Sequence, residues 1–292
     1  MAVFLVYGVV FVLFEDFDKY EIQPFNETTD THLILFSVAV MIVLGFLLHR
    51  YAKSMDERLS RREAEKQAAL RRELTQNIAH ELKTPVAAIL GYTETILENQ
   101  NVTPEITQKF VERTVFQAKR LSSLIGDISM LNQMDYAPQM LKKERINVSI
   151  IVSQVIEDML PLIQKNGMTV SNCLPENICI NGNEMLVYSI FRNLLENSIN
   201  YAGAGSAVEI SAQESGVMWI FTFKDNGPGV DECHLERIFE RFYRTDKSRS
   251  RKQGGTGLGL SIVKNAVLFH GGTISAQNAE NGGLTMRFGL AK

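Results

Sequence analysis

The sequence is poor in the residues from which disulfide frameworks and metal centres are built. Its 292 residues include three cysteines, five histidines and one tryptophan. The cysteines fit no C-x-x-C pattern, and an odd, unpaired set is typical of a reducing compartment. The histidines show no H-E-x-x-H spacing, so we expect no transition metal held by protein ligands. A net charge of −3 argues neither for nor against nucleic acid. No Lys/Arg run is interleaved with aromatics, so we expect no nucleic-acid partner.

Long apolar runs are confined to the first fifty residues. Residues 1–14 are apolar or small, and residues 33–48 carry no Asp, Glu, Lys or Arg. With its flanks, the second run approaches the ~20 residues of a membrane-spanning helix. The first run reaches roughly 21 Å, so it is a short membrane helix, a signal peptide, or a helix whose first turns are missing from this chain. Because it lacks a basic leader and an A-x-A site, we predict two membrane helices, at about 1–14 and 33–50.

Charge is distributed unevenly around these runs. The loop between them, residues 15–32, carries six acidic residues and a single base, Lys19. The segment after the second run is rich in Arg and Lys. This bias predicts that the loop is external and that the rest of the chain is cytoplasmic. The loop is too small to bury a core of its own.

A long helix is predicted to leave the membrane, because residues 53–99 contain no strong breaker except Pro85 and Gly91. Residues 51–72 are highly charged and are predicted to be a solvated connector or a weak two-stranded coiled coil. Beyond them, apolar residues recur at helical spacing, at Leu70, Leu74, Ile78, Leu82, Val86, Ile89 and Leu90. Pro85 either bends this helix or starts a new one after an N-cap at Thr84. The continuous apolar stripe favours the bend.

His80 points away from that stripe, beside Glu81 and one turn before Thr84. An exposed histidine beside a carboxylate, with a hydroxyl one turn away, can act as a nucleophile. A lone histidine at such a position is more often a solvated side chain, so its assignment depends on the rest of the chain.

A second helix is predicted after a turn at residues 99–105, with Thr103 as its N-cap and Pro104 at the first helical position. Its apolar face runs from Ile106 to Leu131, and it ends near residues 135–138. Two antiparallel helices cannot bury both stripes alone. Dimerisation into a four-helix bundle is therefore predicted for residues 73–137.

The remainder of the chain mixes both kinds of secondary structure. Helices are predicted over 150–164, 183–201 and 261–269, extended segments over 168–174 and 177–180, and strand pairs over 207–212 with 217–224 and 273–276 with 284–290. Residues 145–292 should form an α+β sandwich, in which one mixed sheet is covered on one face by helices.

Two polar clusters interrupt this scaffold. Asn193 and Asn197 lie at i and i+4, where their amides could hold a phosphate-bound cation or simply form a solvated helix face. Asp225, Gly227 and Gly229 follow a strand directly. They form either an ordinary turn or a place where a ligand approaches the backbone.

A glycine-rich segment, residues 254–259, leads into a helix. Such a segment exposes backbone N–H groups and the positive end of the helix dipole to phosphates. It matches neither Walker A nor Rossmann spacing. The polar segment before it, residues 241–253, is predicted to be a mobile lid.

Together and in this order, these motifs resemble a bacterial membrane-bound sensor histidine kinase of a two-component system. His80-Glu81-Leu82-Lys83-Thr84-Pro85 is similar to the phosphoacceptor box of that family. Four further motifs are similar to its nucleotide-binding boxes: Asn193-x-x-x-Asn197, Asp225-x-Gly227-x-Gly229, residues 238–244, and Gly255-x-Gly257-x-Gly259. The resemblance extends from about Leu74 to Lys292 and implies a HisKA-type dimerisation domain followed by a GHKL-type ATP-binding domain.

The resemblance implies an ATP-dependent protein-histidine kinase in the bacterial cytoplasmic membrane. His80 would attack the γ-phosphate of ATP and pass the phosphoryl group to an aspartate of a response regulator, while Glu81 accepts the imidazole proton or orients the ring. Asn197 would bind Mg²⁺, Asp225 the adenine amino group, and Arg244 phosphate. The full set implied for ATP is Asn193, Asn197, Tyr201, Asp225, Gly227, Gly229, Arg244, Gly255, Gly257, Gly259 and Leu260.

Glu81-x-x-Thr84 is similar to the phosphatase signature of the family, so Thr84 is expected to position a water that dephosphorylates the regulator. One departure is Asn200, which stands before Tyr201 where the family usually has a lysine, so a phosphate contact is lost or supplied elsewhere. The small loop 15–32 suggests sensing in the bilayer or through an accessory membrane protein. The alternative function is a membrane-anchored ATP-binding scaffold, or degenerate kinase, without phosphotransfer.

Overall fold

The computed structural model describes residues 27–98, 103–245, 256–280 and 282–292, without the side chains of 27–36 and a few positions between 59 and 73. The chain divides into two compact units, Met1–Arg72 and Glu73–Lys292. The predicted first membrane helix, 1–14, lies outside the described residues, as do positions 15–26 of the predicted loop.

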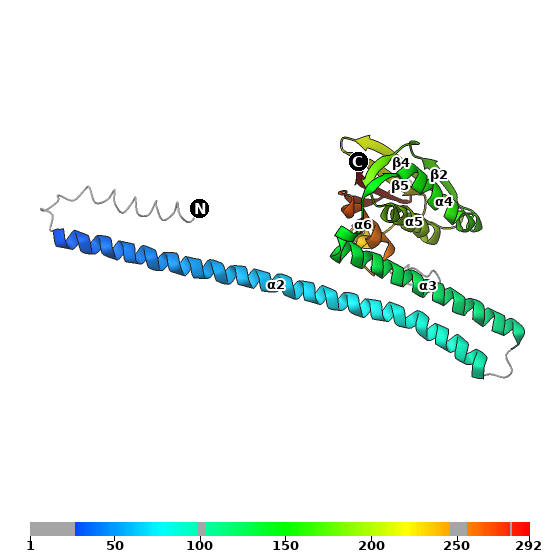
Figure 1. Ribbon diagram of the computed structural model, residues 1–292, viewed down its shortest axis with the longest axis horizontal. Coiled ribbons are helices and arrows are strands. Elements are labelled where there is room, and N and C mark those ends of the chain that lie inside the picture. The colour runs from blue at the N-terminus through cyan, green and yellow to red at the C-terminus, as the bar shows by residue number, and fades with distance from the viewer. Residues whose placement is uncertain (1–26, 99–102, 246–255, 281) are drawn as a thin grey trace. The chain divides into compact units, whose positions relative to one another are not determined.

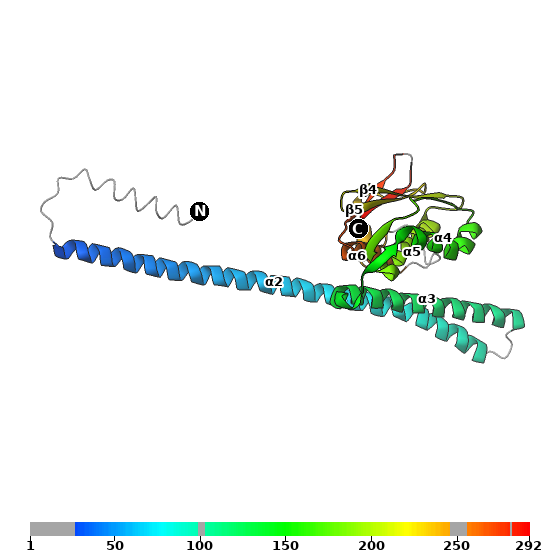
Figure 2. The same cartoon turned by 45° about the horizontal axis from the view of Figure 1, so that its top comes forward.

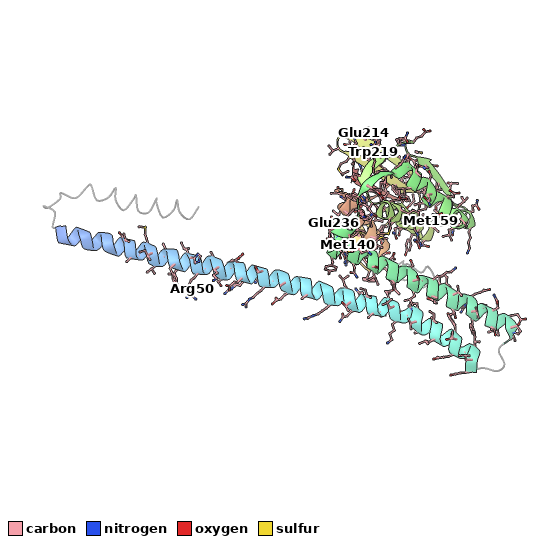
Figure 3. The ribbon with its side chains drawn as sticks, viewed as in Figure 1. Arg50, Met140, Met159, Glu214, Trp219 and Glu236 are labelled. Atoms are coloured by element: carbon pink, nitrogen blue, oxygen red, sulfur yellow. The ribbon has the colours of Figure 1, made fainter. Side chains whose placement is uncertain are left out.

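Helix α2 spans Glu27–Glu98 without interruption. It includes residues 27–32, so the last part of the predicted external loop is helical. The stretch Ser37–Arg62 is the one helix in the described part of the chain that is long and apolar enough to cross a membrane. Its apolar side chains, and those around Arg50, project freely from the helix (Figure 3).

Pro85 lies inside α2, so the alternative of a new helix beginning there is wrong. Proline removes the hydrogen bond to the Glu81 carbonyl. One residue earlier, the Thr84 hydroxyl donates to the His80 carbonyl at 3.3 Å, an arrangement that also favours bending. Figures 1 and 2 show α2 curving in its cyan to green part.

Helix α3, Pro104–Tyr136, returns antiparallel to the end of α2 (Figures 1 and 2). Its N-cap is Thr103, whose side chain accepts from the Ile106 amide at 3.4 Å, as predicted. Two contacts join the helices of this hairpin: Glu81 pairs with Arg120, and the Tyr92 ring stacks on Phe110 with centroids 5.6 Å apart.

The α+β prediction for the rest of the chain is confirmed. A five-stranded sheet has the order β2-β4-β5-β7-β6, with β2 and β4 parallel and the other pairs antiparallel. Helices α4, α5 and α6 cover one face of it (Figures 1 and 2). The strands are β2 Thr169–Cys173, β4 Ala207–Ser215, β5 Met218–Asp225, β6 Ile274–Asn278 and β7 Leu284–Ala291, and the helices are α4 Val148–Lys165, α5 Glu184–Tyr201 and α6 Gly259–Phe269.

The prediction of a single sheet is wrong. Strand β1, Glu144–Asn147, was not predicted, and it pairs with β3, Cys179–Gly182, in a separate two-stranded sheet. A strand of four residues with one buried side chain, Ile146, is too short to show the alternation of buried and exposed residues from which a strand is predicted. Short 3-10 turns complete the elements, with η2 at Pro138–Met140, η3 at Glu232–His234 and η4 at Arg237–Phe239.

The core of this domain lies between the sheet and its helices. Phe191 of α5 contacts Phe221 and Phe288 of the sheet, with ring centroids 5.6 and 5.7 Å apart. His270 is also buried, with Nδ1 2.7 Å from the Ala266 carbonyl and Nε2 accepting from the Asn183 amide. Burial lowers the pKa of His270, which therefore belongs to the core as a neutral side chain.

Candidate functional site

His80 is exposed on the outer face of α2, and 78% of its side chain is accessible. Its Nδ1 lies 3.8 Å from Oε1 of Glu81, and Oε2 of Glu81 lies 3.5 Å from Nη2 of Arg120 on α3. Thr84 is exposed one turn further along. The turn therefore offers an accessible imidazole beside a carboxylate that a second helix holds from the other side.

Asp225 ends β5 and is buried, with 7% of its surface exposed. Its Oδ2 accepts from the Ser198 hydroxyl at 3.1 Å, and its Oδ1 accepts from the amides of Gly227 at 3.0 Å and Leu284 at 3.1 Å. Three donors from three elements offset the cost of burying a carboxylate and fix its orientation.

The turn after Asp225 is closely packed by its neighbours. A Cβ at Gly227 would lie 2.5 Å from Cα of Ala202, at the end of α5. One at Gly229 would lie 2.6 Å from Oδ1 of Asn278, whose amide accepts from the Val230 N–H and donates to the Val230 carbonyl. Glycine is therefore required here because the backbone approaches α5 and β6, which favours a shaped site over an ordinary exposed turn.

The two amides of α5 have different surroundings. Asn193 donates to the carbonyl and the hydroxyl of Ser189, and its Oδ1 faces Gly259, where a Cβ would approach to 2.8 Å. This contact joins α5 to the start of α6. The Asn197 side chain, half-buried, has no hydrogen-bond partner within the described part of the chain. Its amide oxygen is therefore available to a ligand.

The glycine segment is hydrogen-bonded to the first residues of the predicted lid, which runs from residue 241 to residue 253. The Phe242 amide donates to the Gly257 carbonyl at 2.8 Å, and a Cβ at Gly257 would lie 2.9 Å from Cα of Phe242. Both residues have positive φ, +62° and +73°, which is costly for phenylalanine. Tyr243 lies beside them, with its hydroxyl 2.6 Å from Nδ1 of His234. Gly255 and the lid positions 246–253 lie outside the described residues.

The structure brings the α/β residues of the predicted site into one region. Asn193 meets Gly259, Asp225 holds the turn with Gly227, and Gly257 meets Phe242. Tyr201, Arg244 and Leu260 are half-buried. In the described parts of the chain, no hydrogen bond or ion pair joins His80 to this region.

Three residues at the site escaped the sequence-based reasoning, and a fourth, Arg241, was given a different role. Ser198, Asn278 and Gly283 all hold the Asp225 turn; a Cβ at Gly283 would overlap the Asp225 carbonyl. Arg241, assigned to the mobile lid, is instead paired with Asp135 at 2.7 Å. Ser198 alone had a usable signal, since it is a polar residue on the apolar face of α5 that also carries Leu194 and Leu195.

Helix α3 contacts the glycine segment through Asp127. Desolvation, with the nearby Glu196 charge, raises the pKa of Asp127 to about 6, although Arg192 and the Thr256 side chain act in the opposite direction. Two acidic residues of α3 therefore face the α/β domain: Asp127, beside Thr256, and Asp135, which pairs with Arg241.

This pKa gives a testable pH dependence. The folded protein holds the Asp127 proton more tightly than the unfolded chain, so the stabilisation is complete below about pH 4 and is lost as pH rises through about 6. Asp127→Asn should therefore be more stable than the wild type at pH 7.5, by about 1 kcal/mol after solvent screening. Urea unfolding at pH 4.5, 6 and 7.5 measures this. The exposed Asp231→Asn is the control, and parallel curves for wild type and Asp127→Asn would contradict the assignment.

Two family models match the chain. The His Kinase A (phospho-acceptor) domain matches residues 70–137, and the Histidine kinase-, DNA gyrase B-, and HSP90-like ATPase matches residues 182–292. The sensor-like histidine kinase SenX3 of Mycolicibacterium smegmatis is 32% identical over 222 residues, covering 76% of this chain and 58% of that protein. The signal transduction histidine-protein kinase BaeS of Escherichia coli is 32% identical over 222 residues, covering 76% and 47%. The chain spans about half the length of these curated relatives.

Solved structures agree in fold. The Acinetobacter baumannii histidine kinase AdeS superposes with a TM-score of 0.61 at 21% identity, covering 73% of this chain and 97% of that one. Histidine kinase ThkA, solved in complex with response regulator protein TrrA, gives a TM-score of 0.59 at 21% identity, covering 75% and 61%. Since the phosphoacceptor match falls on the hairpin that carries His80 and the ATPase match falls on the sheet domain, the chain belongs to the family of two-component sensor histidine kinases.

Proposed function

We propose that this chain is an ATP-dependent protein-histidine kinase that phosphorylates its own His80 and transfers the phosphoryl group to an aspartate of a response regulator. The observation that carries the proposal is an accessible imidazole beside Glu81, in a chain whose second domain holds a buried carboxylate inside a glycine-walled site. An ATP-binding scaffold without phosphotransfer would have no use for the His80–Glu81 pair.

The residues of the α/β domain fit a nucleotide. Asp225 is held by three donors and would accept the adenine amino hydrogen with its remaining lone pairs. The backbone at Gly227 and Gly229, packed against Ala202 and Asn278, would lie beside the adenine ring. The N–H groups at the start of α6, around Gly257, Gly259 and Leu260, would face the phosphates with the positive end of the helix. Tyr201, Arg244 and Gly255 are assigned to the same ligand.

We assign Mg²⁺ to the amide oxygen of Asn197, supported by Asn193. Mg²⁺ prefers oxygen ligands and is usually held by one or two protein groups together with substrate phosphates. When bound, it neutralises the charge of the β- and γ-phosphates. The chain itself orients the Asn193 side chain: Ser189 accepts two hydrogen bonds from its amide nitrogen, and its amide oxygen faces Gly259.

A second copy of the chain would bury the apolar surface that the hairpin leaves exposed. Apolar side chains remain exposed along both helices: Val86, Leu90, Val111, Val115, Phe116 and Ile125. The match to a phosphoacceptor domain supports a homodimer, whose four helices would bury this surface. The complex of ThkA with a response regulator supports a regulator as the other partner.

We place the membrane region at residues 1–50, a helical connector at 51–72, the dimerisation and phosphotransfer domain at 73–137 and the catalytic domain at 145–292. The apolar stretch of α2 supports attachment to the bacterial cytoplasmic membrane; two spans would leave both ends in the cytoplasm. The small loop 15–32 favours signals received within the bilayer or from an accessory membrane protein. Signalling should then persist after that loop is exchanged for another polar sequence.

The kinase reaction is tested by incubating the purified chain with γ-labelled ATP. The wild type should acquire acid-labile, base-stable label, as a phosphohistidine requires. His80→Gln should acquire none while still binding a fluorescent ATP analogue, because its nucleotide site is intact. Asp225→Asn should lose the label together with nucleotide binding, since an amide nitrogen cannot accept the Ser198 hydrogen bond. Label on His80→Gln would refute His80 as the phosphoacceptor.

Thr84 is proposed to position the water that dephosphorylates the regulator. Its hydroxyl donates to the His80 carbonyl, so its lone pairs remain available to orient a water. Thr84→Ala should reduce dephosphorylation of a phosphorylated regulator by roughly tenfold or more, with autophosphorylation within about twofold of wild type. Thr84→Ser keeps the hydroxyl and is the control. Equal phosphatase activity in all three proteins would exclude this role.

A further inference from the structure

The Glu81 carboxylate is shared between two groups on different helices. Its Oε1 lies 3.8 Å from Nδ1 of His80, while its Oε2 lies 3.5 Å from Nη2 of Arg120. The side chains of Glu81 and Arg120 are 23% and 20% exposed, whereas that of His80 is largely accessible. Arg120 thus holds Oε2 of the carboxylate, and Oε1 points towards His80.

Arg120, which holds Oε2 of Glu81, lies on α3 near side-chain atoms that are buried. Oε1 of Gln117, one turn before Arg120, and Oγ1 of Thr114, about two turns before it, are buried without a hydrogen-bond partner in the part of the chain that the structure describes. This side of the hairpin is therefore partly shielded from water, and a carboxylate turned towards it gains from a charged donor. A guanidinium supplies several N–H donors in a fixed plane.

The proposed phosphorylation requires a carboxylate in this orientation. The lone pair of His80 Nε2 attacks the γ-phosphorus, an Nε2–P bond forms, and the bond from the γ-phosphorus to the β,γ-bridging oxygen breaks. ADP leaves with that electron pair. The imidazole then carries a surplus proton on Nδ1, which passes to Oε1 of Glu81 once the 3.8 Å separation shortens to the about 2.9 Å of a hydrogen bond.

We propose that Arg120 is a positioning residue for this step: from α3, it holds Oε2 of Glu81 so that Oε1 faces Nδ1 of His80. The assignment rests on the proposed phosphorylation of His80. An ion pair this close to solvent contributes little to folding, about 0–1 kcal/mol. Its removal should therefore reduce the rate of phosphorylation much more than the stability of the hairpin.

The test uses the full chain in detergent or nanodiscs and the variants Arg120→Met, Arg120→Lys and Arg113→Met. Methionine keeps an apolar stem without the charge. Arg113 is the matched control, because it lies on the same helix with its guanidinium 5.9 Å from the Tyr92 ring, away from Glu81. The measurements are the maximal rate of His80 labelling, the KM for ATP and the thermal midpoint.

Arg120→Met should lower the maximal rate by roughly tenfold or more, with KM for ATP and thermal midpoint close to wild type. Arg120→Lys should restore part of the rate, and Arg113→Met should resemble wild type. Combining Arg120→Met with Glu81→Gln should cost no more than Glu81→Gln alone, because both changes remove one function. A purely structural role predicts additive losses instead.

The two possible failures are distinguishable. If the wild type acquires no label on His80, the proposed function fails and this role fails with it. If the wild type is labelled but Arg120→Met reacts at the wild-type rate, the role of Arg120 alone is overturned. A loss of rate that follows a matching fall in thermal midpoint or in ATP affinity also overturns it.

Discussion

A buried carboxylate at the end of β5 is the constraint on which the α/β domain depends. Asp225 can remain there only because donors from α5, from the following turn and from β7 reach it together. Those hydrogen bonds bring the end of α5 against the Gly227 backbone, which in turn excludes any side chain at that position. The same hydrogen bonds that stabilise the charge therefore determine the conformation of the turn after Asp225.

Helix α3 contacts both the turn that carries His80 and the α/β domain. In its middle, Arg120 contacts the carboxylate beside His80, and nearer its end, Asp127 and Asp135 face Thr256 and Arg241 of the α/β domain. One helix thus touches both the phosphoacceptor turn and the segments flanking the glycine loop. A shift of α3 along or around its axis would change both sets of contacts at once.

The sequence predicts the elements with strong periodicity and misses what depends on distant partners. Helices α2 to α6 and the β4–β5 and β6–β7 pairs follow from local patterns, and the stripe on both sides of Pro85 correctly indicates a continuous helix. Strand β1 is too short to have a pattern. The site motifs are visible as glycines, amides and one aspartate, but the donors to Asp225 are not, since Leu284 is 59 residues away. Arg120 and Asp127 look like ordinary polar positions on a helix until the hairpin brings Glu81 and Thr256 to them.

The order of strands in the sheet determines when the domain can form during synthesis. Strand β7 is the last in sequence, yet it lies between β5 and β6 and supplies Leu284 to Asp225. Translation must therefore reach residue 291 before the sheet has its inner strand, and until then β5 has an open edge. The hairpin of α2 and α3 depends only on contacts closer in sequence and precedes it. In the proposed homodimer, two nascent chains would thus be able to pair through their hairpins before their α/β domains are complete.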